Sequence, residues 1–319
     1  MIYLDNAAYT RPLQHLKPII NKYFDTLANH QSTHQLGVYN QQLIDHAKEQ
    51  VASAIHCEPD EVFFTRNATD GNRLMVDCDY SIRTISPYEH GGLSSYRKLG
   101  VNTFPNLHML VNNETGKIFD VYAFGSDITS AIGNIDVNLE KLALIYAVGD
   151  SIKFGGIGGG FLYVYKPRQN VDRLSHRGTE NILNVICMGE AIEYATKNID
   201  RKNKHCQMLK DTLLDSLTKN HIDFVCNSGS DCVPSIVSLT FNGVSNEGLA
   251  AYLDSQDILI STGAACQSGS LEPSRVLKAF GLTDEQALST VRISTCLDNT
   301  VEEINYTVDK ITDYINMVK

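Results

Sequence analysis

The apolar positions of this chain follow two different spacings. In residues 40–55 they recur every three or four positions, which is the period of an α-helix with one buried face. That face is expected to hold Leu43, Ile44, Ala47, Val51 and Ile55. Elsewhere the apolar residues form short unbroken runs, which are typical of buried strands.

Three such runs stand in the first half of the chain. We expect strands over residues 61–65, 142–148 and 161–166, and a turn into a helix at "ATDGNRLM", residues 68–75. Strands that alternate with helices favour an α/β fold whose sheet is mixed and largely parallel.

The second half repeats this alternation on a smaller scale. A long helical stretch around residues 185–220 precedes short strands in "SIVSLTF", "DILIST" and "TVRIST". The last helix should begin at Thr300, with Glu303 completing a capping box. We therefore expect a larger domain over residues 11–200 and a smaller C-terminal α/β domain over residues 201–319, joined by residues 1–10.

Composition limits the classes of partner. The chain has 319 residues, of which 43% are hydrophobic and 20% charged, enough to bury a sizeable core. The net charge of −10 and the lack of a basic stripe argue against direct nucleic-acid binding. The sequence shows no signal peptide and no apolar run of ~18 residues, so we expect a cytoplasmic protein without a membrane span.

Eight cysteines occur without any CxxC pair, so reduced single thiols are expected rather than a zinc site or another metal site. Most should fill the core, as Cys187 in "NVICMGEAI" would. Cys266 differs, because "STGAACQSGSLEPS" surrounds it with small and polar residues and predicts an accessible, mobile loop.

A second chemical feature is Lys153, which follows a predicted strand and precedes five glycines around Ile157. A lone lysine is often only a surface charge. At a strand end of an α/β sheet, however, a desolvated amine can act as a covalent nucleophile. The amides near Thr69, at the start of a helix, would suit a phosphate group, and Asp127 could pair with a pyridinium nitrogen. Together these residues suggest pyridoxal 5'-phosphate (PLP).

Ordered motifs over nearly the whole chain strengthen this reading. They are "YLDNAAYT", "NHQSTHQLG", "FTRNATDGN", "EHGGL", "VNNETG", "SDITSAIG", "SIKFGG", "HRGTEN", "STGAACQSGSLEPSRVL" and "STVRIS". In these motifs the chain resembles NifS/IscS-type cysteine desulfurases, PLP enzymes of the class V aminotransferase group. The resemblance implies the PLP-dependent transferase fold, fold type I.

The resemblance also implies roles for single residues at the cofactor. It assigns the covalent cofactor bond to Lys153, a phosphate contact to Thr69 and ring stacking to His90. It implies that Asn113 contacts the cofactor's phenolic oxygen and that Asp127 contacts its ring nitrogen. Thr179 would reach the phosphate of a partner subunit, which implies a homodimer.

On the substrate side, the resemblance implies that L-cysteine is converted to L-alanine. Arg292 would clamp the substrate carboxylate, with Asn29 and Asn113 beside the substrate. The catalytic set would be Cys266, Lys153 and His90, with a persulfide formed on Cys266. A sulfur-acceptor protein would then take the sulfur, either for iron–sulfur cluster assembly or for tRNA thiolation.

The chain departs from the family pattern close to the lysine. Asp150 and Ile152 stand where the family usually has a serine and a histidine that help bind phosphate, and the stretch between His90 and Asp127 is short. Two alternatives therefore stay open. One is a cofactor-free dimeric scaffold in a sulfur-transfer system, and the other is a PLP-dependent lyase acting on a different sulfur amino acid.

Overall fold

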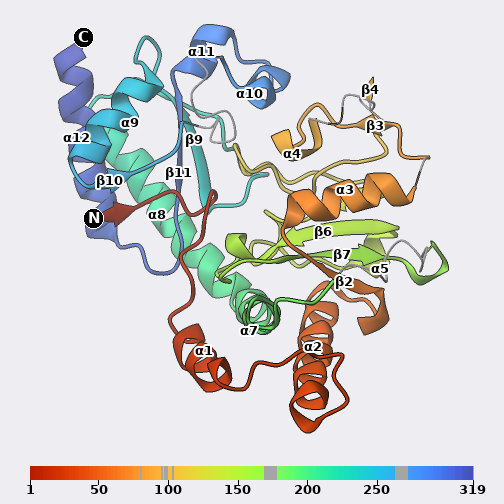
Figure 1. Ribbon diagram of the computed structural model, residues 1–319. Helices are drawn as coiled ribbons and strands as arrows, with labels where there is room; N and C mark the ends of the chain where they lie inside the picture. Colours follow the sequence, from red (N-terminus) through yellow and green to blue (C-terminus); the bar gives the residue numbers. More distant parts are fainter. Residues whose placement is uncertain are drawn as a thin grey trace. The chain divides into compact units, whose positions relative to one another are not determined.

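The computed structural model describes residues 1–79, 81–94, 96, 100–102, 104–168, 178–262 and 272–318 (Figure 1). The chain divides into two compact units. The larger unit consists of Thr10–Leu110 and Asp120–Ile199, and the smaller unit of Met1–Tyr9, Val111–Phe119 and Asp200–Lys319. Residues 111–119, which the predicted boundaries put in the larger domain, therefore belong to the smaller unit.

The larger unit is built on a mixed sheet. Its central strands lie in the order β2 (Val62–Thr65), β7 (Gly160–Val164), β6 (Tyr146–Asp150) and β5 (Gly125–Asp127). Parallel bridges from Gly125 to Leu107 and from Leu107 to Ile85 continue the sheet to β3 (Thr84–Ile85) and β4 (Gly100–Val101). Only the pairs that β7 makes are antiparallel among these strands, so the sheet is mostly parallel, as predicted.

Helices cover both faces of this sheet. They are α1 (Leu16–Phe24), α2 (Gln35–Ile55), α3 (Ala68–Cys78), α4 (Gly91–Ser94), α5 (Leu139–Leu142) and α7 (Ile182–Lys197), with short 3-10 turns η1 (Pro59–Glu61), η2 (Ser151–Lys153) and η3 (Lys166–Arg168). Figure 1 shows α3 on one face and α2 with α7 on the other. The buried face of α2 holds Ile44, Ala47, Val51 and Ile55, as its apolar period predicted, whereas Leu43 is only half-buried.

The core of the larger unit lies between α3 and the sheet. It includes Met75 from the helix, Tyr146 and Val148 from β6, and Leu162 from β7, all nearly inaccessible to water. This core fixes α3 against the carboxyl ends of β5 and β6, where the candidate cofactor residues lie.

One predicted strand begins too early. The expected strand over residues 142–148 starts at Tyr146, because Leu142 is the last residue of helix α5 and residues 143–145 form the turn that leaves it. Asn138 caps that helix by accepting a hydrogen bond from the Lys141 amide, and Ala143 ends it with a positive φ of 51°. The cap therefore overrides the apolar run.

The smaller unit has its own sheet and core. β11 (Thr290–Ser294), β9 (Ile236–Thr240) and β8 (Val225–Cys226) form an antiparallel sheet in that order, and β1 (Ile2–Tyr3) pairs in parallel with β10 (Ile258–Leu259). The helices are α8 (Ile199–Lys219), which starts at the last residue of the larger unit, α9 (Asn246–Ser255), α10 (Arg275–Ala279), α11 (Asp284–Leu288) and α12 (Val301–Val318). Leu213, Leu239, Phe241, Ile293 and Ile311 are among its core residues.

The cap of α12 forms as the sequence predicted. The Glu303 amide donates to Thr300 Oγ1 at 3.2 Å, and the Thr300 amide donates to Glu303 Oε2 at 3.1 Å. Among the helices that the structure describes, none is long and apolar enough to cross a membrane.

Candidate active site

The candidate cofactor residues of the larger unit gather at the carboxyl ends of two parallel strands. Asp127 ends β5 and Asp150 ends β6, and the register pairs Asp127 with Val148. Lys153 follows Asp150 within the turn η2. This edge of an α/β sheet is where such folds bind ligands.

The carboxylate of Asp127 is buried and oriented. Its Oδ1 accepts a hydrogen bond from the Thr129 amide at 3.0 Å, and its Oδ2 accepts one from Asn72 Nδ2 at 3.2 Å. Each carboxylate oxygen can accept more than one hydrogen bond, so this group can also receive an N–H from a ring. The Thr129 hydroxyl is buried without a partner in the part of the chain that the structure describes, as expected beside a site for a polar ligand.

The lysine turn is held by the segment that begins the larger unit. Thr10 donates from its amide to the Ile152 carbonyl and from Oγ1 to the Lys153 carbonyl, both at 2.8 Å. Gly155 has a φ of +93°, and a Cβ there would lie 2.7 Å from Leu13 Cγ. This close approach therefore requires a glycine at position 155. The side chain of Lys153, which is half-buried, extends from a backbone that these contacts hold in place.

His90 and Thr69 lie on the two sides of Gly92. A Cβ added at Gly92 would stand 3.1 Å from His90 Nδ1 and 3.3 Å from Thr69 Oγ1. The Gly92 amide donates to His90 Nδ1 at 3.1 Å, which leaves the proton of a neutral imidazole on Nε2. The lack of a side chain at Gly92 thus allows the predicted ring-stacking residue and the predicted phosphate contact to approach it closely.

Asp150 contacts the start of α3. Its Oδ2 accepts a hydrogen bond from the Ala68 amide at 3.0 Å, and its Oδ1 accepts one from the Ile152 amide at 3.2 Å. Burial raises the pKa of the Asp150 carboxyl above its usual range, while these two amides and the charge of Lys153 act in the opposite direction. The sequence could not predict this contact, because 82 positions separate the two residues.

Two other predicted residues of the larger unit lie on its surface. Thr179 is exposed and lines an open groove of about 560 Å³ together with Arg66, Asn181 and Asn184. Asn29 is also exposed, and its Oδ1 accepts a hydrogen bond from the Gln31 amide at 2.9 Å. Their expected roles, at a partner's phosphate and at the substrate, stay predictions.

The smaller unit contains the predicted carboxylate clamp. Arg292, on β11, is 2% exposed and forms an ion pair with Asp5, with 2.7 Å between Nη2 and Oδ1. Its Nη1 donates to the Asn113 carbonyl at 2.8 Å, and its Nε has no hydrogen-bond partner among the described residues. Asn113 therefore lies beside Arg292 in the smaller unit, and the other predicted cofactor residues are in the larger unit.

Cys266 lies outside the described residues, but both ends of its segment are anchored in the smaller unit. Before it, Ser261 and Arg292 exchange two backbone hydrogen bonds of 3.1 and 2.7 Å. After it, Ser274 Oγ donates to Glu114 Oε2 at 2.6 Å, next in sequence to Asn113. The described residues on either side of the segment, Ser261 and Ser274, therefore contact Arg292 and Glu114.

Several residues that position the site were missed from the sequence, among them Asp5, Thr10 and Glu114. Each lies inside or beside a motif quoted above, since Asp5 and Thr10 belong to "YLDNAAYT" and Glu114 to "VNNETG". Each motif could be recognised in the sequence. The neighbouring residues, however, did not indicate which polar side chain of the motif would bond to a residue far away along the chain.

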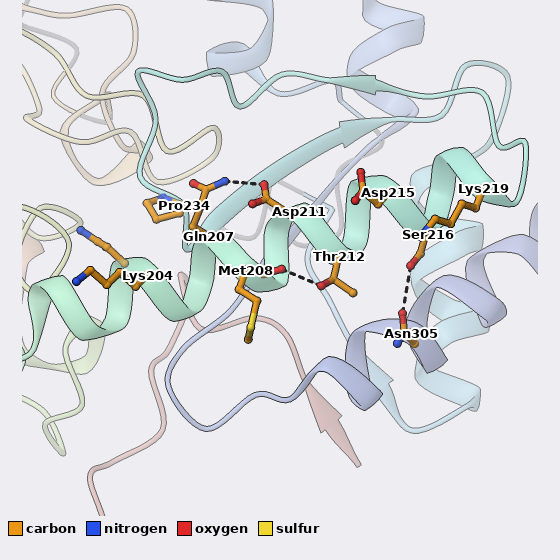
Figure 2. A pocket seen from close by; sticks show the side chains of 11 residues that line it. Lys204, Gln207, Met208, Asp211, Thr212, Asp215, Ser216, Lys219, Pro234 and Asn305 are labelled. Atoms are coloured by element: carbon orange, nitrogen blue, oxygen red, sulfur yellow. Dashed lines mark hydrogen bonds between the residues drawn. The ribbon is translucent and has the colours of Figure 1, made fainter.

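A different groove, of about 840 Å³, runs along α8 in the smaller unit (Figure 2). Its side chains mainly bond to one another, as in the 2.7 Å contact of Gln207 with Asp211 and the 3.1 Å contact of Ser216 with Asn305. It contains none of the candidate site residues. Within the described ranges, no group of three or more His, Cys, Asp or Glu side chains is placed to hold a metal ion.

Comparison with known proteins identifies the family of this chain. The profile of the family "Aminotransferase class-V" matches residues 2–83 and 155–307. The cysteine desulfurase IscS of Dictyoglomus turgidum is 28% identical over 380 aligned residues, which cover 100% of this chain and 95% of the relative. IscS of Methylobacillus flagellatus is also 28% identical, covering 100% and 93%.

Solved structures share the fold. The NifS-like protein from Rickettsia africae superposes with a TM-score of 0.88, at 24% identity and over 99% of each chain. The apo structure of a cysteine desulfurase from Thermococcus onnurineus has a TM-score of 0.81 at 18% identity, covering 99% of this chain and 95% of the other.

The fold, with Lys153 and the Asp127 carboxylate near the carboxyl ends of its parallel strands, defines a PLP-dependent transferase of fold type I. The chain belongs to the aminotransferase class-V family. The family depends on PLP. The oriented carboxylate of Asp127, the Thr129 hydroxyl beside it, unpartnered among the described residues, and the half-buried Lys153 fit this cofactor. The matched ranges leave out residues 84–154, the part that contains Asp150.

Proposed function

We propose that this protein is a cysteine desulfurase that converts L-cysteine to L-alanine and collects the sulfur as a persulfide on Cys266. The two IscS relatives are named for this activity, and they align with the whole chain. Each unit contains residues to which the proposal assigns a step of the reaction.

The larger unit would hold the cofactor and move the proton. PLP, when bound, supplies an electron sink for the charge that develops at the substrate α-carbon. Lys153 would bind the cofactor and carry a proton to and from that carbon. Asp127, fixed by Thr129 and Asn72, would keep the ring nitrogen protonated, and His90 would lie against the ring.

The smaller unit would bind the substrate and take its sulfur. Arg292 would bind the carboxylate of L-cysteine, and its unpartnered Nε–H supports this role. The thiolate of Cys266 would attack the substrate sulfur, forming an S–S bond while the C–S bond breaks. The electron pair of the broken bond stays with the carbon, which takes up a proton, so alanine leaves and the persulfide remains.

One observation carries this proposal most directly. The segment that contains Cys266 begins at Ser261, whose backbone pairs on both sides with Arg292. The predicted nucleophile is therefore only five positions along the chain from a residue that adjoins the predicted carboxylate clamp. A buried filler cysteine would not need such a connection.

Substitution of Cys266 by Ala tests the function. We expect this variant to bind PLP like the wild type but to lose at least about 100-fold in alanine formation and all persulfide labelling. Cys232→Ala is the matched control, because Cys232 is a half-buried thiol in the same unit whose pKa burial raises to about 11, and it should keep full activity.

Two results would contradict the proposal. If Cys266→Ala kept its turnover, the protein would be a PLP-dependent lyase that does not use this thiol. If the wild type, folded and dimeric, bound no PLP at saturating concentration and formed no alanine, the scaffold alternative would hold.

The finer parts of the proposal concern assembly and partners. We expect a homodimer in which the exposed Thr179 contacts the phosphate bound by the partner subunit. A separate sulfur-acceptor protein would take the persulfide sulfur, for iron–sulfur cluster assembly or tRNA thiolation. A cytoplasmic location, expected from the composition and the reduced cysteines, belongs to the same proposal.

A further inference from the structure

We propose that Asp150 is an internal anion that competes with the cofactor phosphate for the Ala68 amide at the start of α3, so that phosphate binding is coupled to proton uptake by this carboxylate. This inference rests on the cofactor site that the proposed function uses. It concerns the affinity for the cofactor and not the fate of the substrate sulfur.

The start of α3 offers few amides to a ligand. The Asn67 side chain caps the helix by accepting a hydrogen bond from the Asp70 amide at 2.8 Å. The Ala68 amide donates to Asp150 Oδ2 at 3.0 Å. Helix N-termini attract anions because their first amides point outward and the helix dipole is positive there. A carboxylate of the chain itself already occupies this position.

Asp150 is held firmly in that position. Its second oxygen accepts the Ile152 amide, and its backbone pairs in register with Gly160 on β7. A Cβ at Gly160 would lie 2.7 Å from the Asn67 carbonyl carbon and 2.7 Å from the Gly149 oxygen, so β7 passes directly against the turn before α3. Since two strands and a helix start converge on this residue, the carboxylate cannot swing away without losing both amide bonds.

Several charges surround the carboxylate. Lys153 acts on it from η2 and Asp127 from the end of β5. Asp70 also belongs to the first turn of α3, where it pairs with Arg66. Thr69 belongs to α3, and His90 lies on the opposite side of Gly92 from it. Burial already raises the pKa of Asp150, with Asp127 adding to this direction. A phosphate dianion nearby would raise the pKa further, because it makes the ionised carboxylate still less favourable.

The sign of the pH dependence follows from this shift. Because the pKa of Asp150 is higher with phosphate present than without it, binding takes up a proton. The affinity for PLP should therefore fall as the pH rises through the pKa of Asp150 in the complex. Pyridoxal, which lacks the phosphate, should not show this part of the dependence.

The test measures dissociation constants for PLP and for pyridoxal by absorption and fluorescence titration between pH 6 and pH 9. Asp150→Asn removes the charge at constant size, and Asp150→Ser is a second variant for the case that the first does not fold. We expect either variant to bind PLP at least about tenfold more tightly than the wild type at pH 8, and pyridoxal within about twofold.

Asp70→Asn is the matched control, because it removes a carboxylate from the same helix turn without touching the Ala68 amide. It should change the affinity for PLP by less than about threefold. A gain below about tenfold for PLP in the Asp150 variants, an equal gain for pyridoxal, or an equal gain in the control would overturn the proposal.

An independent readout uses inorganic phosphate alone. We expect phosphate to raise the melting temperature of Asp150→Asn more than that of the wild type, because the vacated amide can bind it. An equal shift in the two proteins would overturn the proposal. None of these measurements uses Cys266 or turnover, so the binding constants stay interpretable if the desulfurase assignment fails. Likewise, the activity assays stay interpretable if the proposal for Asp150 fails.

Discussion

At the scale of single residues, the ion pair of Arg292 with Asp5 links the first strand region of the smaller unit to β11. The guanidinium is almost fully buried, and the Asp5 side chain is 22% exposed. A charge left alone in such a place is costly, because neither water nor a counter-ion stabilises it.

We therefore expect Asp5→Ala to lower the free energy of unfolding by about 3 kcal/mol, the lower end of the range for broken buried pairs, because Asp5 is partly exposed. Urea denaturation measures this change. Asp298→Ala, on the surface of the same unit, is the control and should change the stability by less than about 0.5 kcal/mol. A loss for Asp5→Ala no larger than in the control would show that the pair is not buried as described.

At the scale of elements, the parts with strong local signals were predictable. The apolar face of α2, the run that forms β2 and the capping box of α12 each depend on neighbours in sequence, and all three form. β5 was not predicted, because its residues Gly125–Asp127 are small or polar and gain their buried state only from the strands beside them.

The candidate site shows the same limit. Its motifs could be found along the chain, but their partners could not. The bond from the Ala68 amide to Asp150 and the pair of Asp5 with Arg292 join residues 82 and 287 positions apart. Such contacts depend on strand register and on the packing of the sheet edge, which no local pattern encodes.

The capping box of α12 gives a prediction at this scale. We expect Thr300→Ala to lower the free energy of unfolding by about 1 kcal/mol, because the Glu303 amide loses its acceptor at the helix start. Thr212→Ala on α8 serves as the control, since the Thr212 hydroxyl bonds only to the Met208 carbonyl within its own helix. Denaturation midpoints of the two variants that coincide would contradict the cap's contribution.

At the scale of the whole molecule, the expected homodimer can be tested by mixing subunits. Lys153→Ala should abolish cofactor binding in its own subunit, and Thr179→Ala should weaken it in the partner. In a mixed dimer of the two variants, one site would carry both changes and the other neither. We therefore expect mixing to restore one full-affinity site per dimer, measured by PLP titration of dimers isolated with two different tags.

Homodimers of each variant are the controls for this experiment. If Thr179 acts within its own subunit, the mixed dimer contains one site altered at Lys153 and one altered at Thr179, and no full-affinity site appears. A protein that sediments as a monomer at the concentrations of the assay would also refute the proposed assembly.

The anchors of the Cys266 segment set a limit on sulfur delivery. Ser261 is fixed by Arg292, and Cys266 follows five residues later. An extended chain spans at most about 3.5 Å per residue, so at most about 18 Å can separate the Cα atoms of Ser261 and Cys266. With Cys266 as the proposed persulfide carrier, an acceptor would have to bring its own sulfur-receiving atom within this backbone reach plus the length of the cysteine side chain. Docking distance, and not diffusion of a released sulfur species, would then be the condition for transfer.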